Sequence, residues 1–213
     1  TAPQPCPYLP ERQERKLFTH LTHEKPPAVV DNLLKGGFRR SQNIAYRPAC
    51  EGCQSCISVR VAVDKFKPTK NMRRILRSNA DIEAQDVRSK ATSEHYGLFR
   101  DYIDARHGSG GMADMSVLDF AAMVDESFVD SHLTEYRLRS PEGGDSELVG
   151  TVLVDTLEDG LSLIYSFYEP SLNHRSLGTY IVLEQIERAK QRGLSYLYLG
   201  YWVRGSDKMA YKA

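Results

Sequence analysis

The sequence predicts an α+β protein with two parts: a small cysteine-containing N-terminal domain at residues 1–75, and a larger domain with a mixed sheet at residues 76–213. Eight of the ten prolines and all four cysteines lie in the first part, which is otherwise irregular. From about residue 79 the chain shows longer periodic segments separated by polar turns. A length of 213 residues is enough for one or two such domains.

The N-terminal domain has two recognisable elements. Residues 28–35 predict a short helix that ends at Gly36 and Gly37, and the apolar residues from Ile57 to Val63 alternate as on a half-buried strand. A domain with so few apolar anchors often needs an additional link, which gives a physical reason for the cysteines to cluster here.

The larger domain shows strand and helix patterns in a clear order. A strand at 80–87 precedes helices at 93–106 and 116–124, and Ser116 is expected to cap the second helix. Three strands separated by turn residues follow, at 132–138, 147–155 and 160–168. The strongest helix, at 176–192, ends at Gly193 and precedes a last strand at 195–202.

This order of elements is that of the acetyltransferase-like (GNAT-type) acyltransferase fold, in which the strands on either side of the last helix splay apart and the donor enters the gap. The first turn of that helix has unpaired N–H groups and a positive dipole end. Acyl-CoA members carry R-x-x-G-x-G/A here, and Arg175 to Gly178 match its first half, whereas Tyr180 replaces the last small residue. An ordinary helix start is the alternative interpretation.

Composition limits the possible partners. The 28 basic and 28 acidic residues balance, so the whole molecule has no general attraction for nucleic acid, and we expect no DNA partner. Apolar stretches fall short of the roughly 20 residues of a membrane helix, and the N-terminus lacks a secretory pattern. We expect a cytoplasmic protein without a membrane partner.

Three cysteines, Cys50, Cys53 and Cys56, form a C-x-x-C-x-x-C motif. Because disulfides are rare in cytosolic proteins, this spacing favours a bound metal or cluster, with Cys6 as the fourth ligand. Spacing alone does not distinguish zinc from an iron-sulfur cluster. Reduced thiols that pack as small apolar groups are the alternative.

Short blocks spread from residue 6 to residue 212 carry a family resemblance. They are 6–10 (CPYLP), 37–41 (GFRRS), 46–50 (YRPAC), 166–170 (SFYEP), 176–180 (SLGTY), 198–203 (YLGYWV), 208–209 (KM) and 211–212 (YK). In this order they resemble the bacterial branch of the aminoacyl-tRNA protein transferases, and they span nearly the whole chain.

The resemblance implies an enzyme that moves an amino acid from charged tRNA, its co-substrate, to the N-terminal Asp or Glu of another protein, marking that protein for degradation. Leucine is the donor in the bacterial branch and arginine in the eukaryotic branch. Family members continue past the equivalent of residue 213, so we expect a C-terminal tail to be missing here. An N-terminal amine, with a pKa of about 7.7–8.0, is already partly neutral, so positioning should dominate and we name no general base.

The resemblance also gives meaning to the arginines near residue 40. Arg39, Arg40 and Arg47, with Tyr46 beside them, are the expected acceptor site, because guanidinium groups bind carboxylates in bidentate form. If Arg39 and Arg40 lie on a strand they point to opposite faces, so at most one touches the acceptor. Surface arginines that merely solvate a strand are the alternative.

Six cations lie between residues 65 and 77, with no acid after Asp64. They can neutralise tRNA phosphates, whereas a solvated linker between domains is the alternative. At the last strand an aromatic face can stack on the terminal adenine of tRNA. The candidates for donor and tRNA binding are Arg73, Arg74, Arg77, Arg175, Ser176, Leu177, Gly178, Tyr201, Trp202, Lys208 and Lys212.

Two other functions stay open at this point. One is an acetyl-CoA N-acetyltransferase, which the fold favours and Tyr180 disfavours. The other is a non-catalytic protein that binds acidic N-termini or tRNA.

Overall fold

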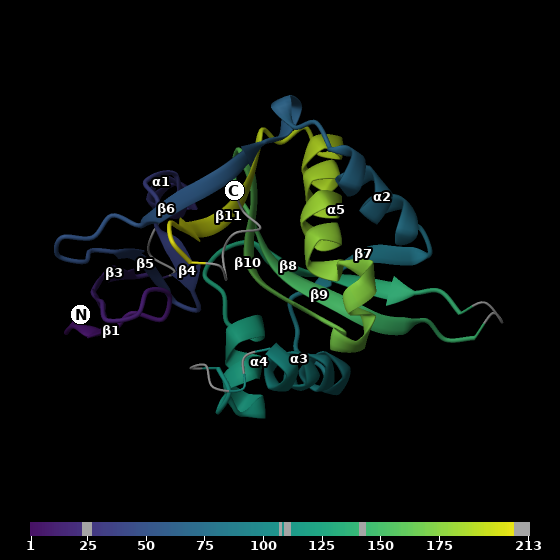
Figure 1. Ribbon diagram of the computed structural model, residues 1–213, viewed down its shortest axis with the longest axis horizontal. Coiled ribbons are helices and arrows are strands. Elements are labelled where there is room, and N and C mark those ends of the chain that lie inside the picture. Colours follow the sequence, from purple (N-terminus) through teal and green to yellow (C-terminus); the bar gives the residue numbers. More distant parts are fainter. Residues whose placement is uncertain (23–26, 107, 109–111, 141–143, 207–213) are drawn as a thin grey trace.

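The computed structural model describes residues 1–22, 27–106, 108, 112–140 and 144–206. It shows a large mixed sheet with helices on both faces and a smaller β-rich unit beside it (Figure 1). Among the described residues, none of the helices has the length and apolar character needed to span a bilayer.

Six strands form the main sheet, in the spatial order β6 (Cys56–Ala62), β11 (Tyr196–Val203), β10 (Gly160–Tyr168), β9 (Glu147–Thr156), β8 (Ser131–Leu138) and β7 (Ile82–Arg88). Neighbouring strands are antiparallel, except β10 and β11, which are parallel. The central strand β9 is buried along most of its length, because helices cover both faces of the sheet.

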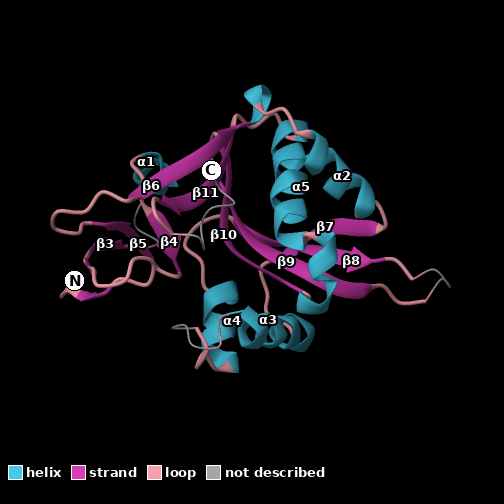
Figure 2. Ribbon diagram, viewed as in Figure 1, coloured by secondary structure: helices cyan, strands magenta, loops and turns pink. Residues whose placement is uncertain are grey.

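Helices α2 (Lys70–Ser78) and α5 (Leu177–Gln191) cover one face, and α3 (Ser93–Arg106) and α4 (Val117–Asp125) cover the other (Figure 2). Alternate residues of β9 serve the two faces: Val152 and Val154 pack with α5, and Leu153 packs with α3 and α4. Ser116 caps α4 as predicted, because its side chain accepts from the backbone N–H of Asp119. Short 3-10 turns, η1 (Val63–Lys65) and η2 (Pro170–Arg175), precede α2 and α5.

The smaller unit contains two small antiparallel sheets. Strands β1 (Gln4–Pro5) and β2 (Gln13–Glu14) form one, and β3 (Lys16–His20), β5 (Ile44–Pro48) and β4 (Arg39–Ser41) form the other. Helix α1 (Pro27–Lys35) packs beside the second sheet. Leu34 of α1 and Tyr198 of β11 belong to one buried cluster, so the small unit packs against β11 of the main sheet.

The predicted fold class is confirmed, but two features of the first 75 residues differ from expectation. Strand β6 belongs to the main sheet, where it pairs with β11, although it lies within the segment assigned to the N-terminal domain. The segment interpreted as a possible linker is helical: α2 is capped by Thr69 and buries Ile75. The linker interpretation is therefore wrong.

Candidate active site

The parallel strands β10 and β11 diverge soon after they begin. They pair at three positions, the last being Ser162 opposite Tyr198. Beyond this point both strands are irregular, β10 between Leu163 and Tyr165 and β11 at Gly200. Gly200 has φ +78°, in the left-handed region that glycine adopts without steric cost. We call this divergence the splay, and it lies where the order of elements predicts the donor gap.

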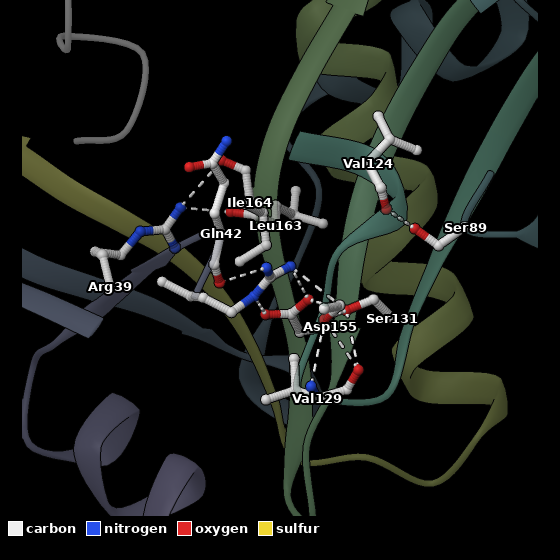
Figure 3. A network of polar contacts seen from close by, with 11 residues as sticks. Arg39, Gln42, Ser89, Val124, Val129, Ser131, Asp155, Leu163 and Ile164 are labelled. Atoms are coloured by element: carbon white, nitrogen blue, oxygen red, sulfur yellow. Dashed lines mark hydrogen bonds and ion pairs between the residues drawn. The ribbon is translucent and has the colours of Figure 1, made fainter. Parts of the chain in front are cut away.

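Arg39 reaches from β4 into the splay. Its Nη2 donates to the carbonyl oxygens of Leu163, at 2.6 Å, and Ile164, at 3.5 Å, both on β10 (Figure 3). The guanidinium also lies against Gly200 of β11, where an added Cβ atom would be 2.7 Å from Cζ and Nε of Arg39. Arg39 therefore touches both diverging strands at the point where their pairing ends.

Arg40 points to the opposite face of β4, as expected for consecutive strand residues. Its Nε and Nη2 each donate to an oxygen of Asp155 at 2.6 Å. Ser131 Oγ donates to the same carboxylate at 2.6 Å (Figure 3). The side chains of Arg40 and Asp155 are 1% and 0% exposed. The prediction that Arg40 binds an acceptor is therefore wrong, because its guanidinium is buried and already holds a carboxylate.

Arg47 is exposed, in contrast to Arg39 and Arg40. Its guanidinium lies 5.3 Å from the centre of the Phe38 ring. It lines an open cavity of about 330 Å³ with Gly37, Pro48, Ala49, Cys56, Ser58 and Tyr201. Of the three candidates, Arg47 is thus the one that is exposed and lines this cavity.

Tyr201 forms a wall of this cavity and joins β11 to the small unit. Its Oη donates to the carbonyl oxygen of Gly37 at 2.6 Å and to that of Tyr46 at 3.3 Å. The rings of Tyr46 and Tyr201 are 6.5 Å apart. Burial raises the pKa of Tyr201 above its ordinary value, so the hydroxyl stays protonated and acts as a donor. Trp202, the next residue, is partly exposed.

The start of α5 is fixed by contacts with the segment that follows α2. Arg175 makes a bidentate ion pair with Asp81, at 2.8 and 2.9 Å, and this bonding lowers the pKa of Asp81. The buried Asn79 donates to the carbonyl oxygen of Arg175 at 3.0 Å. The structure thus gives Arg175 an internal partner, and its predicted role in donor binding is not favoured.

The next three residues of this turn have different environments. Ser176 has a left-handed backbone, with φ 55°, and Leu177 is buried at 2% exposure in the main core, so any contact of Leu177 with the donor would come from its backbone. An added Cβ at Gly178 would lie 2.9 Å from Oη of Tyr168, so the helix start packs closely against β10. Ser176 and Gly178 remain candidates, and Gly178 lies against Tyr168 at the end of β10.

The six cations between residues 65 and 77 lie on one exposed face of α2 and on the segment that precedes it. Arg73 donates to the carbonyl oxygen of Pro68, and Arg74 bonds to Asn71. Within the described part of the chain, none of the six cations forms an ion pair, and all are exposed: Lys65, Lys67, Lys70, Arg73, Arg74 and Arg77. Lys208 and Lys212 lie outside the described residues.

The four cysteines come together around one small cavity of about 60 Å³, which Tyr8 and Tyr201 also line. Hydrogen bonds from Ser55 and the charge of Arg12 lower the pKa of Cys53, whereas burial and the neighbouring thiols raise the pKa of Cys56 to about 11. Among the described residues, no three His, Cys, Asp or Glu side chains are arranged to hold a metal ion. The thiols converge as predicted, but their arrangement does not support the zinc or iron-sulfur prediction.

Two residues of this region were not predicted from the sequence. Gly200 interrupts the strand pattern YLYLGYWV, and a glycine inside a strand is a known signal for a bulge or a close approach. Asp155 is an acid at the end of a buried apolar strand, which signals a buried ion pair but does not identify the partner.

Solved structures with the same architecture define the class of fold. FemX matches with a TM-score of 0.54 at 10% identity, over 92% of this chain and 65% of that protein. The C-terminal domain of a putative lysylphosphatidylglycerol synthetase from Agrobacterium fabrum matches with a TM-score of 0.51 at 10% identity, over 83% and 52%. Both have GNAT-like folds. This chain belongs to the same fold class, because its parallel strands β10 and β11 diverge and α5 connects them in the sequence.

Sequence comparison identifies the family within this class. Residues 4–74 match the N-terminal model, and residues 94–213 the C-terminal model, of the arginine-tRNA-protein transferases, so the chain belongs to this family. An aspartate/glutamate leucyltransferase of Xanthobacter autotrophicus is 55% identical over 100% of this chain and 87% of its own length. Relatives with the same name from Azorhizobium caulinodans and Nitrobacter hamburgensis are each 56% identical, over 100% of this chain and 87% and 84% of their lengths.

Proposed function

We propose that this chain is a cytoplasmic aminoacyltransferase that moves leucine from leucyl-tRNA to the N-terminal Asp or Glu of proteins, which marks them for degradation. The observation that carries the proposal is the identity of 55–56% to aspartate/glutamate leucyltransferases over the whole chain. The splay supports it, because in this fold class the donor enters where the two strands beside the last helix stop pairing, and β10 and β11 stop pairing after Ser162.

In this reaction the neutral α-amine of the acceptor attacks the ester carbonyl of the aminoacyl-tRNA. An amide C–N bond forms, the ester C–O bond breaks, and the ribose hydroxyl leaves with the proton that the amine loses. The protein's main contribution is to hold amine and ester together, which makes the attack effectively intramolecular. The N–H groups in the first turn of α5 have no partner within the helix and can stabilise negative charge on the carbonyl oxygen.

The acceptor's acidic side chain is assigned to Arg47 and its cavity. Arg47 is exposed, lies beside Gly37 and Tyr201, and offers the planar fork that binds a carboxylate in bidentate form. Tyr201 links this cavity to β11, one side of the splay. An acceptor bound here would direct its main chain along this wall toward the donor.

The donor's tRNA is assigned to the exposed face of α2. Six cations that form no ion pair with the described residues make a local positive patch on a chain of balanced charge. The helix packs on α5, whose first turn lies against Tyr168 at the end of β10, so phosphate contacts here would leave the aminoacyl end on the same side of the molecule.

The test is transfer of radiolabelled amino acid to peptides that differ in their first residue. Leucyl-tRNA and arginyl-tRNA would be offered separately with peptides beginning with Asp, Glu or Ala. We expect leucine on the Asp and Glu peptides and none on the Ala peptide. Transfer from arginyl-tRNA would show that arginine is the donor. Acetylation of the peptides by acetyl-CoA would show that the chain is an N-acetyltransferase instead. Peptide binding without transfer would make the chain a non-catalytic binding protein.

A further inference from the structure

We propose that Arg39 is a positioning residue that fixes the separation of β10 and β11, and that it does not bind the acceptor's carboxylate. The inference rests on the proposed function, because the splay matters to catalysis only if the donor reacts there. It differs from the sequence-based expectation, which placed Arg39 in the acceptor site with Arg47.

The first argument comes from the carbonyl groups of β10. In a parallel pair, amides of the neighbouring strand donate to these oxygens, but pairing with β11 ends at Ser162. Just beyond, the carbonyl of Leu163, a residue of 9% exposure, accepts from Arg39 Nη2 at 2.6 Å. A buried carbonyl left without a donor is unfavourable, because it loses its hydrogen bond to water without gaining another. Arg39 thus supplies the hydrogen-bond donor that β11 no longer provides, and so stabilises the separation of β10 and β11.

The second argument comes from the opposite strand. The flat guanidinium lies so close to Gly200 that a methyl group there would meet Cζ and Nε at 2.7 Å. Gly200 also has a positive φ, and the register of β11 against β6 shifts between Tyr198 and Gly200. The distance between the strands therefore matches the thickness of one guanidinium group. A lysine, with a round ammonium group and no planar fork, cannot fill this space in the same way.

The third argument concerns how firmly Arg39 is held. The next residue, Arg40, is tied to Asp155 of β9 in a buried bidentate pair, and the carbonyl of Gly37 accepts from Tyr201 of β11 at 2.6 Å. The backbone of β4 is thus attached to the main sheet on both sides of Arg39. These attachments hold Arg39 in place, so that its side chain can set the distance between β10 and β11.

The kinetic test uses Arg39→Ala, Arg39→Lys and Gly200→Ala, with Arg139→Ala as a control on the far side of the sheet. Because a misplacement of about 1 Å can lower a rate on the order of a hundredfold, we expect kcat to fall roughly 30- to 100-fold in Arg39→Ala and Gly200→Ala. KM for leucyl-tRNA and the preference for Asp over Ala peptides should stay at wild-type values. Added guanidinium ion, well below denaturing concentrations, should restore part of kcat in Arg39→Ala and none in Gly200→Ala.

Hydrogen exchange of the same proteins gives a readout independent of transfer. We expect faster exchange in residues 163–166 and 199–202 of Arg39→Ala and unchanged exchange in β7 and β8. A raised KM for the Asp peptide with lost selectivity and unchanged kcat would overturn the inference and return Arg39 to the acceptor site. Wild-type exchange in both segments would also overturn it. If the wild-type protein transfers no amino acid, the proposed function fails, while the exchange experiment still decides whether Arg39 fixes the strands.

Discussion

Replacing Arg40 by methionine should destabilise the protein strongly, because it leaves a buried carboxylate without its counter-ion. Arg40 contributes two bonds of 2.6 Å to Asp155, whose side chain is 0% exposed. Ser131 Oγ, at 2.6 Å, is a neutral donor and cannot balance the charge. Breaking a buried pair from one side typically costs about 3–5 kcal/mol. For a chain of 213 residues this corresponds to a fall in Tm of about 6–20 °C.

The assay is urea-induced unfolding, followed by far-UV circular dichroism and by the fluorescence of the single tryptophan, Trp202. Arg40→Met combined with Asp155→Leu should recover most of the loss, because an apolar pair replaces an ion pair at little net cost. Arg139→Met is the matched control: its partner Glu83 is 65% exposed, and such surface pairs contribute about 0–1 kcal/mol. The reasoning is refuted if Arg40→Met costs no more than the control, or if the double variant is no more stable than the single one.

Three further predictions concern binding and reactivity. Arg47→Ala should lower kcat/KM for an Asp peptide on the order of a hundredfold, about 2–3 kcal/mol, and leave tRNA affinity unchanged; retained preference for Asp over Ala would place the acceptor elsewhere. Iodoacetamide at pH 8 should modify Cys53 first and Cys56 last, because a lowered pKa increases the thiolate fraction and a pKa of about 11 suppresses it; peptide mass spectrometry would reveal the reverse order if this is wrong. Combined alanine substitution of Arg73, Arg74 and Arg77 should weaken the binding of leucyl-tRNA and make the dependence of log K on log salt concentration shallower by about 2–3. An unchanged slope would show that the exposed face of α2 does not contact tRNA.

Local patterns were sufficient to predict most of the larger domain. The helix at 93–106 has the predicted bounds, and the capping residue Ser116 starts α4 as expected. The alternation of faces also separated Arg39 from Arg40 correctly, since one reaches the splay and the other the core. These features depend on neighbouring residues in the chain, which is why a single sequence contains them.

The missed features depend on distant partners or on weak local signals. Helix α2 was not predicted, because only a narrow stripe of Met72, Ile75 and Leu76 packs against the core and the other residues are mostly charged. Thr69, which caps this helix, is the local signal that could have indicated it. The partner of Arg40 comes from a strand more than a hundred positions away, and nothing local identifies it. The same holds for β6, whose strand pattern was recognised but whose place in the main sheet was not.

The position of β6 at the outer edge of the main sheet has a consequence for how the chain folds. Its neighbour β11 follows it by more than 130 residues in the sequence, so β6 is synthesised long before the strand with which it pairs. Until then its backbone groups form an open edge that other chains can join. Contacts between such distant segments also slow folding, because a long loop must close before they form. We therefore expect aggregation during synthesis to begin at residues 56–62 and to decrease once β11 has covered one of the two edges of β6.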